Sequence, residues 1–339
     1  MKDKREQNKK RSKRMLLLLM LLFMTGTMLV TSTYAWFTSN ETVTVNRITV
    51  NVSTAGGIQL SADGTNWKTL LLTTDLTSVH STSYTSSVNQ LPSQLEPVST
   101  GLNVTAAGKL EMFYGVIQAN NDGDFILTAT PSVETESNGS TSTGKFVAFD
   151  LFFKSDSATD LYLTGDSGVT TSDASDKGIK NAARVAFVVL GNTTSSDTVA
   201  HIQALGTTNA TSSPVYMWEP NYDVHTANAV AHARDTYAIT TTQTGAARIS
   251  YDGVIASITA ANDVEVGDAN ATTYSSYFQS VSPSYYTVEG NSSSTQIFGL
   301  QEGVTKVRVY MWVEGQDVDC ENTASGGNIN FDLVFSINS

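Results

Sequence analysis

The chain has a single cysteine and four histidines among its 339 residues. One cysteine excludes a disulfide framework and any cysteine-rich zinc module. Charged residues make up 15% of the sequence, which argues against coiled coils and charged solvating tails, since about 25% is usual in globular proteins. The hydrophobic share of 40% supplies enough apolar material for a core. What remains is an acidic chain rich in Ser, Thr, Asn and Gly, which favours β structure.

Charge is divided unevenly along the chain. Eight of the 20 Lys and Arg residues and two of the 32 acids lie in residues 1–14, so the remainder carries a net charge of −18. Such an acidic body repels phosphate backbones, and the sequence therefore predicts no nucleic-acid partner.

The N-terminus predicts export. A basic run, Lys2–Arg14, precedes an apolar stretch, Met15–Val30, and small residues follow at Thr33 and Ala35. This order is typical of a secretory signal peptide, here residues 1–35, with cleavage by signal peptidase between Ala35 and Trp36. A stretch of sixteen residues is short for a membrane span, which needs about 20, although an uncleaved anchor is the alternative. We expect a secreted protein, associated with the cell surface, that touches the membrane only through its leader before cleavage.

The leader, its junction Tyr34-Ala35-Trp36-Phe37-Thr38-Ser39 and the Val/Thr-rich strand that follows resemble the TasA/camelysin-like family. These are Gram-positive exported proteins with SipW-dependent-type signal peptides. The stretch Val307–Phe335 also looks like the C-terminal end of uncharacterised members. The resemblance implies a jelly-roll-type sandwich, a role as a matrix-fibre protein and assembly through N-terminal strand exchange. Camelysin is grouped with metallopeptidases, so the resemblance also requires a test of whether the chain has the residues of a zinc protease.

Period-two alternation of apolar residues predicts the principal strands. Ile329–Ile337 and Val307–Val313 alternate strictly, as half-buried strands do. Apolar residues are more closely spaced in Phe146–Phe153 and Arg184–Leu190, as expected for central strands in a sandwich. Weaker strand candidates are Phe125–Leu127 and Val215–Trp218. Many strands separated by polar turns predict an all-β fold, an antiparallel β-sandwich that is jelly-roll-like, with long loop insertions and short helices.

We expect an N-terminal strand or arm over residues 36–52 and an elaborated β-sandwich domain over residues 53–339, with two sandwiches as the alternative. The stretch Leu70–Thr105 suggests a long insertion, and residues 176–183 and 254–262 suggest short helices. Within the arm the alternation slips at Asn46-Arg47, which predicts a β-bulge. Its aliphatic residues form the predicted assembly strand: Val43, Val45, Ile48, Val50 and Val52.

No sequence motif supports catalysis, and we expect no catalytic residue and no enzyme activity. Gly165-Asp166-Ser167-Gly168 spells the start of a trypsin-like nucleophile motif, but that chemistry needs a histidine base and a buried aspartate. Only His80 precedes the serine, without the expected flanks. The four residues therefore predict a β-turn.

The histidines do not match a zinc protease. His225 and His232 lie seven residues apart, whereas a zincin places two histidines one helical turn apart with a glutamate between them. Two turns separate the pair by about 10 Å, which is too far for one zinc ion. We expect both to be surface histidines in a loop.

Two other clusters have a functional and a structural interpretation. Four acids within eight residues, Glu314, Asp317, Asp319 and Glu321, are weak calcium candidates, although they lack the full twelve-residue calcium loop and turn chemistry also explains them. No other cofactor is expected. Trp218-Glu219-Pro220-Asn221-Tyr222 suggests carbohydrate stacking, or simply a strand that ends at Pro220.

Cys320 lies between two acids, which should raise its pKa and blunt its reactivity. An odd cysteine in an exported protein can still pair between chains.

Two function classes follow from the sequence. The first is a secreted structural protein of the cell surface or extracellular matrix that self-associates into filaments by N-terminal strand exchange. The alternative is a secreted metallopeptidase-like hydrolase or a carbohydrate- or ligand-binding surface module. For the arm itself, donation to a neighbouring copy and pairing within its own subunit both remain open.

Overall fold

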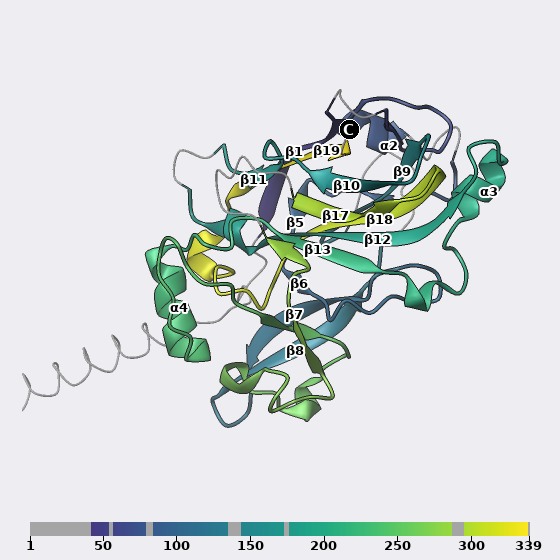
Figure 1. The fold of residues 1–339 in the computed structure, drawn as a ribbon. Helices are drawn as coiled ribbons and strands as arrows, with labels where there is room; N and C mark the ends of the chain where they lie inside the picture. Colours follow the sequence, from purple (N-terminus) through teal and green to yellow (C-terminus); the bar gives the residue numbers. More distant parts are fainter. Residues whose placement is uncertain are drawn as a thin grey trace, which may run out of the picture.

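The structure, a computed structural model, describes residues 42–53, 57–78, 84–134, 144–172, 176–286 and 295–337. The fold is all-β, and its centre is a sandwich of two seven-stranded sheets (Figure 1). We name the first one sheet A; its strands are β1 (Val43–Val52), β3 (Leu70–Leu72), β5 (Gln94–Leu95), β10 (Thr159–Leu163), β11 (Gly168–Thr170), β17 (Thr295–Leu300) and β19 (Asn328–Ile337). We name the second one sheet B; its strands are β2 (Gln59–Ser61), β4 (Asn89–Gln90), β9 (Val147–Ser155), β12 (Ala183–Thr193), β13 (Val215–Glu219), β16 (Tyr285–Tyr286) and β18 (Gly303–Val313).

Two smaller sheets and several short helices complete the described chain. The small sheets are β6 (Val98–Ser99), β7 (Met112–Ala119) and β8 (Phe125–Ser132), and the pair β14 (Tyr251–Val254) and β15 (Phe278–Val281). The α-helices are α2 (Thr73–Ser78), α3 (Val199–Ala204) and α4 (Ala227–Tyr237). The 3₁₀ turns are η2 (Ile179–Ala182), η3 (Ala210–Ser212), η4 (Ala260–Asn262), η5 (Val266–Asp268) and η6 (Asn322–Ala324). No helix in these described segments is both long and apolar enough to cross a membrane.

The predicted sandwich is confirmed, and its strands are mainly antiparallel. The principal exception joins the two ends of the described chain, because β1 runs parallel to β19 with Val45 opposite Ile329 and Val52 opposite Phe335. The register shifts between Val45 and Arg47, which confirms the bulge expected from the slip in the alternation. A parallel pair of strands this distant in sequence leaves no local signal.

The core between the two sheets is dominated by aromatic rings from alternating strand positions. The ring of Phe335 on β19 meets Phe153 edge-on at a centroid distance of 5.1 Å and Phe187 at 5.9 Å. These rings belong to one continuous cluster that also contains Val43, Ile48, Val50 and Val52 of β1. The inward-facing period-two residues of both sheets therefore interlock, as the alternation predicted.

Sheet B is buried on its other face as well. The sheet of β6, β7 and β8 lies on the side of sheet B that faces away from sheet A (Figure 1). Val98 and Met112 pack there against Tyr310 and Trp312 of β18. Every residue of β18 is consequently buried. The prediction of a half-buried strand at Val307–Val313 was wrong for that reason.

Other local expectations are corrected by the structure. The stretch Leu70–Thr105 is less an insertion than a series of short elements, since β3 and β5 join sheet A and β4 joins sheet B. Both stretches expected to hold a short helix contain a 3₁₀ turn, η2 within residues 176–183 and η4 at the end of residues 254–262, which begin with the last residue of β14. The weak candidate Phe125–Leu127 is the start of the eight-residue strand β8.

Candidate functional site

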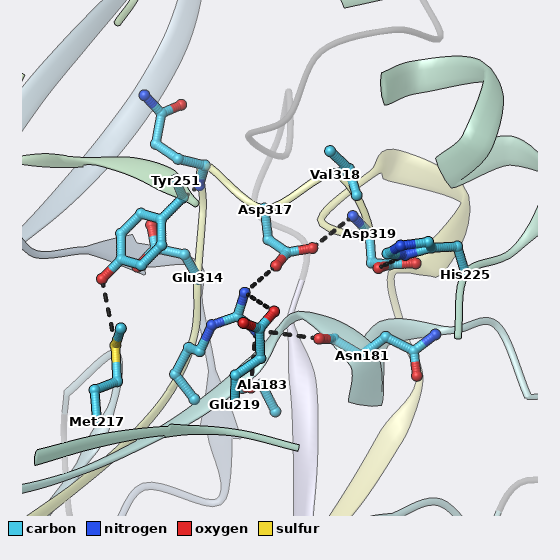
Figure 2. Close-up of polar contacts among 12 residues, drawn as sticks. Asn181, Ala183, Met217, Glu219, His225, Tyr251, Glu314, Asp317, Val318 and Asp319 are labelled. Atoms are coloured by element: carbon cyan, nitrogen blue, oxygen red, sulfur yellow. Dashed lines mark hydrogen bonds and ion pairs between the residues drawn. The ribbon is translucent and has the colours of Figure 1, made fainter. Parts of the chain in front are cut away.

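A cluster of buried charged residues lies at one end of sheet B. Arg184 stands at the start of β12, Glu219 at the end of β13, and Glu314 directly after β18. Because β12 runs antiparallel to both β13 and β18, the start of β12 meets the ends of both neighbours. The turn-rich chain after β18 then carries Asp317 and Asp319 into the same place (Figure 2).

Arg184 is the centre of this cluster. Its Nη2 donates to Glu219 Oε1 at 2.7 Å and to a carboxylate oxygen of Asp317, and its Nη1 donates to the backbone oxygens of Asn181 and Ala183. The side chain of Arg184 is 1% exposed and that of Glu219 is 6% exposed. Burial alone would lower the pKa of Arg184, but Glu219 and Asp317 raise it above its ordinary value. The guanidinium therefore stays charged.

A histidine–aspartate pair adjoins the arginine. His225 Nδ1 lies 2.7 Å from Asp319 Oδ2, and the two side chains are 5% and 2% exposed (Figure 2). The Asp319 backbone N–H donates to Asp317 Oδ1 at 2.8 Å, which fixes the pair relative to Arg184. His225 itself is held by its backbone N–H, which donates to the carbonyl of Gln243 at 2.9 Å.

Helix α4 holds this arrangement in place. Thr226 caps the helix by accepting a hydrogen bond from the Ala229 N–H at 3.0 Å, and it also donates to Glu321 at 3.1 Å. Farther along the helix, the Nδ1 atom of His232 lies 2.8 Å from the carbonyl oxygen of Val318. The helix is thus attached to the chain segment that carries Asp317 and Asp319.

Burial shifts the acid–base properties of the cluster. It raises the pKa of Glu219 to about 7 despite the opposing charge of Arg184, and it raises the pKa of Asp319 to about 6 despite the hydrogen bond from His225. Burial would lower the pKa of His225, but Asp319 outweighs it and raises that pKa above its ordinary value. Burial thus brings the pKa of Glu219 and Asp319 toward neutral pH, and such shifts occur at functional sites and in some structural ion-pair networks.

A cavity of about 460 Å³ opens beside the cluster. Its wall is formed by parts of the chain far apart in sequence and includes Glu219, Tyr222, His225, Tyr237, Tyr251, Asp252, Ala269, Thr272 and Asp317. Two polar atoms of residues in this wall are buried without a hydrogen-bond partner, Glu219 Oε2 and His225 Nε2. A buried carboxylate or imidazole atom with no partner is costly, and both of these atoms are covered by protein rather than open to the cavity.

The four weak calcium candidates have protein partners in the structure. Asp317 binds Arg184 and Asp319 binds His225, while Glu314 accepts from the indole N–H of Trp312 at 2.9 Å and Glu321 accepts from Thr226. Within the described segments, no three His, Cys, Asp or Glu side chains converge in a way that would hold a metal ion. The four carboxylates are partners of protein donors instead.

The expectation of surface histidines was wrong for both members of the pair. His225 is 7% exposed and His232 is 1% exposed, because α4 packs over the segment after β18. His225 belongs to the cluster, whereas His232 is bound to a backbone carbonyl. The two imidazole rings therefore have different partners, one a carboxylate and the other a backbone carbonyl.

Two other motifs have clear positions. Gly165 and Asp166 form the predicted turn, and Ser167 Oγ donates to the carbonyl of Val334 at 3.1 Å and accepts from its N–H at 2.9 Å, which is a structural role. Trp218 is fully buried and stacks on Tyr285, so it is unavailable to a sugar, while Glu219 and Tyr222 line the cavity. The cleavage site Ala35/Trp36 lies outside the described residues.

Arg184 and Glu219 were not recognised from the sequence as partners. The available signal was a charged residue beginning an otherwise apolar strand, in Arg184–Leu190, and an acid ending another, in Val215–Glu219. Charged residues are almost never fully buried unless paired, so two such positions in dense strands suggest mutual contact. Nothing in the sequence indicated which acid would reach Arg184.

No protein-family model, no curated protein and no solved structure matches this chain.

Proposed function

We propose that the chain is a secreted structural protein of the cell surface or extracellular matrix, which assembles into filaments by exchange of β1 between copies. The observation that supports the proposal is the position of β1 in sheet A. Among the strands of the described segments, β1 lies between β19 and the short strands β3 and β5 and pairs with all three. Of the predicted assembly residues, Val43, Ile48, Val50 and Val52 are buried and Val45 is half-buried.

The place of β1 in sheet A can be filled by the chain's own strand or by the same strand of a neighbouring copy. Without it, β19 would present an open edge of unpaired N–H and C=O groups, and the core would lose four aliphatic side chains. Among the described elements β1 is the first, and the rest of the sandwich follows it after Val52, so a neighbouring copy can donate the same residues in the same register. Donation from each copy to the next does not close on itself and produces a filament. In the single chain, β1 pairs within its own sheet, which is the other arrangement the sequence left open.

A pair of truncations tests the proposal. Removal of residues 1–46 deletes the first part of β1, whereas removal of residues 1–41 stops before it and serves as the matched control. If β1 is donated, the longer truncation stays folded by circular dichroism but no longer forms filaments by light scattering and electron microscopy. Unfolding of the longer truncation would instead assign β1 to its own subunit. A wild-type chain that remains monomeric at high concentration would refute assembly altogether.

Export forms part of the same proposal. The leader predicts processing by signal peptidase and release to the cell surface or medium. Mass-spectrometric reading of the secreted N-terminus should begin at Trp36. A secreted form that retains Met15–Val30 would contradict cleavage and favour an anchor.

A ligand-binding surface module is the second candidate function. It is favoured by a specific observation, the cavity of about 460 Å³ whose wall includes the polar and aromatic residues Glu219, Tyr222 and His225. Thermal unfolding of the secreted chain with a panel of small polar compounds tests this candidate, because a ligand of the folded state raises the melting temperature.

A further inference from the structure

The entry to β1 is connected by a short chain of contacts to the wall of the cavity. The carbonyl of Thr42, just before β1, accepts from the Gly326 N–H at 3.1 Å. Gly326 follows the 3₁₀ turn η6, and Glu321 at the N-cap of that turn accepts from Thr226 at 3.1 Å. Thr226 is next to His225, which lines the cavity. One short turn and two hydrogen bonds therefore link the start of the described chain to this wall.

Six residues precede Thr42 in the chain that cleavage by signal peptidase would leave. They are Trp36-Phe37-Thr38-Ser39-Asn40-Glu41, and cleavage gives Trp36 a new α-amino group. Six residues span up to about 20 Å when extended. A 3₁₀ turn rises only about 2 Å per residue, and η6 has three residues. The two aromatic residues at the tip therefore have the reach to pass η6 and arrive at the cavity.

The apolar part of the cavity wall suits aromatic rings. Four of its aromatic and aliphatic residues are half-buried, so their side chains are partly open: Tyr222, Tyr237, Ile239 and Ile249. Aromatic rings prefer offset or edge-on contact with other rings and pack well on aliphatic side chains. The volume of about 460 Å³ lies within the range of about 300–1,000 Å³ that is typical of pockets for small ligands. An aromatic dipeptide is a ligand of this size class.

The wall also carries a carboxylate for a positive group. Its acidic and basic side chains are Glu219, His225, Asp252 and Asp317, and no lysine or arginine of the described segments lines it. Glu219 and Asp317 bind Arg184, and His225 is paired with an aspartate. Asp252 is half-buried, and no residue in the described part of the chain forms an ion pair with its carboxylate. Asp252 is therefore the acid that remains to pair with a cation.

We propose that this cavity receives the processed N-terminus, with the rings of Trp36 and Phe37 against its tyrosines and isoleucines and the α-ammonium group paired with Asp252. An α-ammonium group is largely protonated at neutral pH. The tip follows β1 into whichever sandwich that strand completes, so the cavity serves a strand that stays in its own subunit as well as a donated one. This inference rests on the cleavage between Ala35 and Trp36 that belongs to the proposed function, and it does not depend on filament formation.

Tethering to β1 favours this docking. Only a few residues separate the aromatic tip from the strand, so the concentration of the tip at the cavity is of millimolar order. A contact too weak to hold a free dipeptide is therefore sufficient to hold the tip. The docked tip would in turn fix the end of β1 on the sandwich.

Photo-crosslinking in the full secreted chain tests the proposal. The photoreactive residue p-benzoylphenylalanine takes the place of Phe37, which leaves Trp36 and its α-amino group unchanged. Mass spectrometry of the cross-linked peptides locates the contact, and the intact mass shows whether the chain begins at Trp36. Asp252→Asn removes the charge in the wall. Asp156→Asn, at an exposed position between β9 and β10 that does not line the cavity, is its matched control.

Cross-links should form to peptides that contain Tyr237–Tyr251 or Gln316–Val318, with equal yield in Asp156→Asn. The yield should fall at least about threefold in Asp252→Asn, because loss of a hydrogen bond to a charged group weakens docking by about tenfold or more. An unchanged yield in Asp252→Asn would overturn the pairing with the α-ammonium group, and cross-links confined to other parts of the chain would overturn the inference.

The same experiment separates this inference from the proposed function. Cross-links to the wall within one chain or between two chains both support the inference, and their masses show whether β1 is its own or donated. Cross-links to the wall in a chain that never forms filaments would overturn assembly and leave the inference standing. A secreted chain that keeps its leader would overturn cleavage and, with it, the inference.

Discussion

Asp150 on β9 and Arg308 on β18 stand directly opposite each other in sheet B, with Arg308 Nε donating to Asp150 Oδ1 at 2.8 Å. Their side chains are 0% and 4% exposed. Lys306 Nζ lies 3.5 Å from the other carboxylate oxygen, to which Tyr84 also donates at 2.7 Å. Burial would raise the pKa of Asp150, but Arg308 and Lys306 outweigh it and lower that pKa to about 2. One carboxylate thus neutralises charge on two buried cations.

Replacement of this carboxylate should be severe. Asp150→Ala removes the nearest carboxylate from the buried cations Arg308 and Lys306, while Glu134 stays 3.7 Å from Arg308 Nη1, and a loss of about 3–5 kcal/mol in the free energy of unfolding is expected. Urea unfolding measures it, and Asp122→Ala, in an exposed turn, is the control expected to stay within about 0.5 kcal/mol. If the loss were no larger than in the control, water would be solvating Arg308 and Lys306 in place of the Asp150 carboxylate.

The aromatic centre of the sandwich gives a second prediction. Phe335 is fully buried between Phe153 and Phe187, so Phe335→Ala should lower the free energy of unfolding by about 3–5 kcal/mol through lost burial and the cavity left behind. Leu72→Ala is the matched control, since Leu72 is 45% exposed on β3 of the same sheet. Comparable losses in both variants would contradict the assignment of the core to the space between the sheets.

Strand positions could be predicted because they depend on local pattern. The alternation of Ile329, Phe331, Leu333 and Phe335 places one side of β19 in the core, and the structure buries all four. What covers the opposite side of a strand depends on distant residues. Tyr310 has the pattern of an outward position, yet it is buried because Leu110 and Glu134 from a remote segment reach its hydroxyl.

The candidate site was less predictable for the same reason. Helix α4 did carry a usable signal, an alanine-rich sequence after Thr226, which is a favoured N-cap residue. Recognition of that helix would have shown that His225 precedes it. The contact of His225 with Asp319, 94 residues away, depends on how α4 packs, and the spacing of residues does not encode it.

Cys320 should be unreactive in the folded protein. It is fully buried, and burial together with Asp317 and Glu314 raises its pKa well above the ordinary value. Since the thiolate is the reactive form, we expect no labelling by a thiol reagent under native conditions and complete labelling in denaturing guanidinium chloride. Non-reducing electrophoresis should give a single monomeric band. A disulfide-linked dimer would show that Cys320 becomes accessible and would support a disulfide between two chains.

Stability should fall as pH rises through the range from about 4.5 to about 7, because of Glu314. Its side chain is fully buried beside Trp312, and burial raises its pKa to about 7. In the unfolded chain a glutamic acid loses its proton near pH 4.3, so between the two values the unfolded state has released a proton that the folded state still holds. Deprotonation therefore favours unfolding across this window, by up to about 3 kcal/mol at pH 8 relative to pH 4 for this group. The raised pKa values of Asp319, Glu219 and His225 act in the same direction.

Urea unfolding at pH 5 and pH 8 checks this prediction. The wild-type chain should be more stable at pH 5, and Glu314→Gln should lessen the difference because the amide cannot lose a proton. Glu302→Gln, at an exposed position beside the start of β18, should leave the difference unchanged. Asp150 should affect the pH dependence of stability in the opposite direction. Its pKa is lowered in the folded state, so its contribution to the free energy of unfolding is lost only as the pH falls below about 4. A Glu314→Gln variant with the full wild-type pH dependence would assign the titration to other groups.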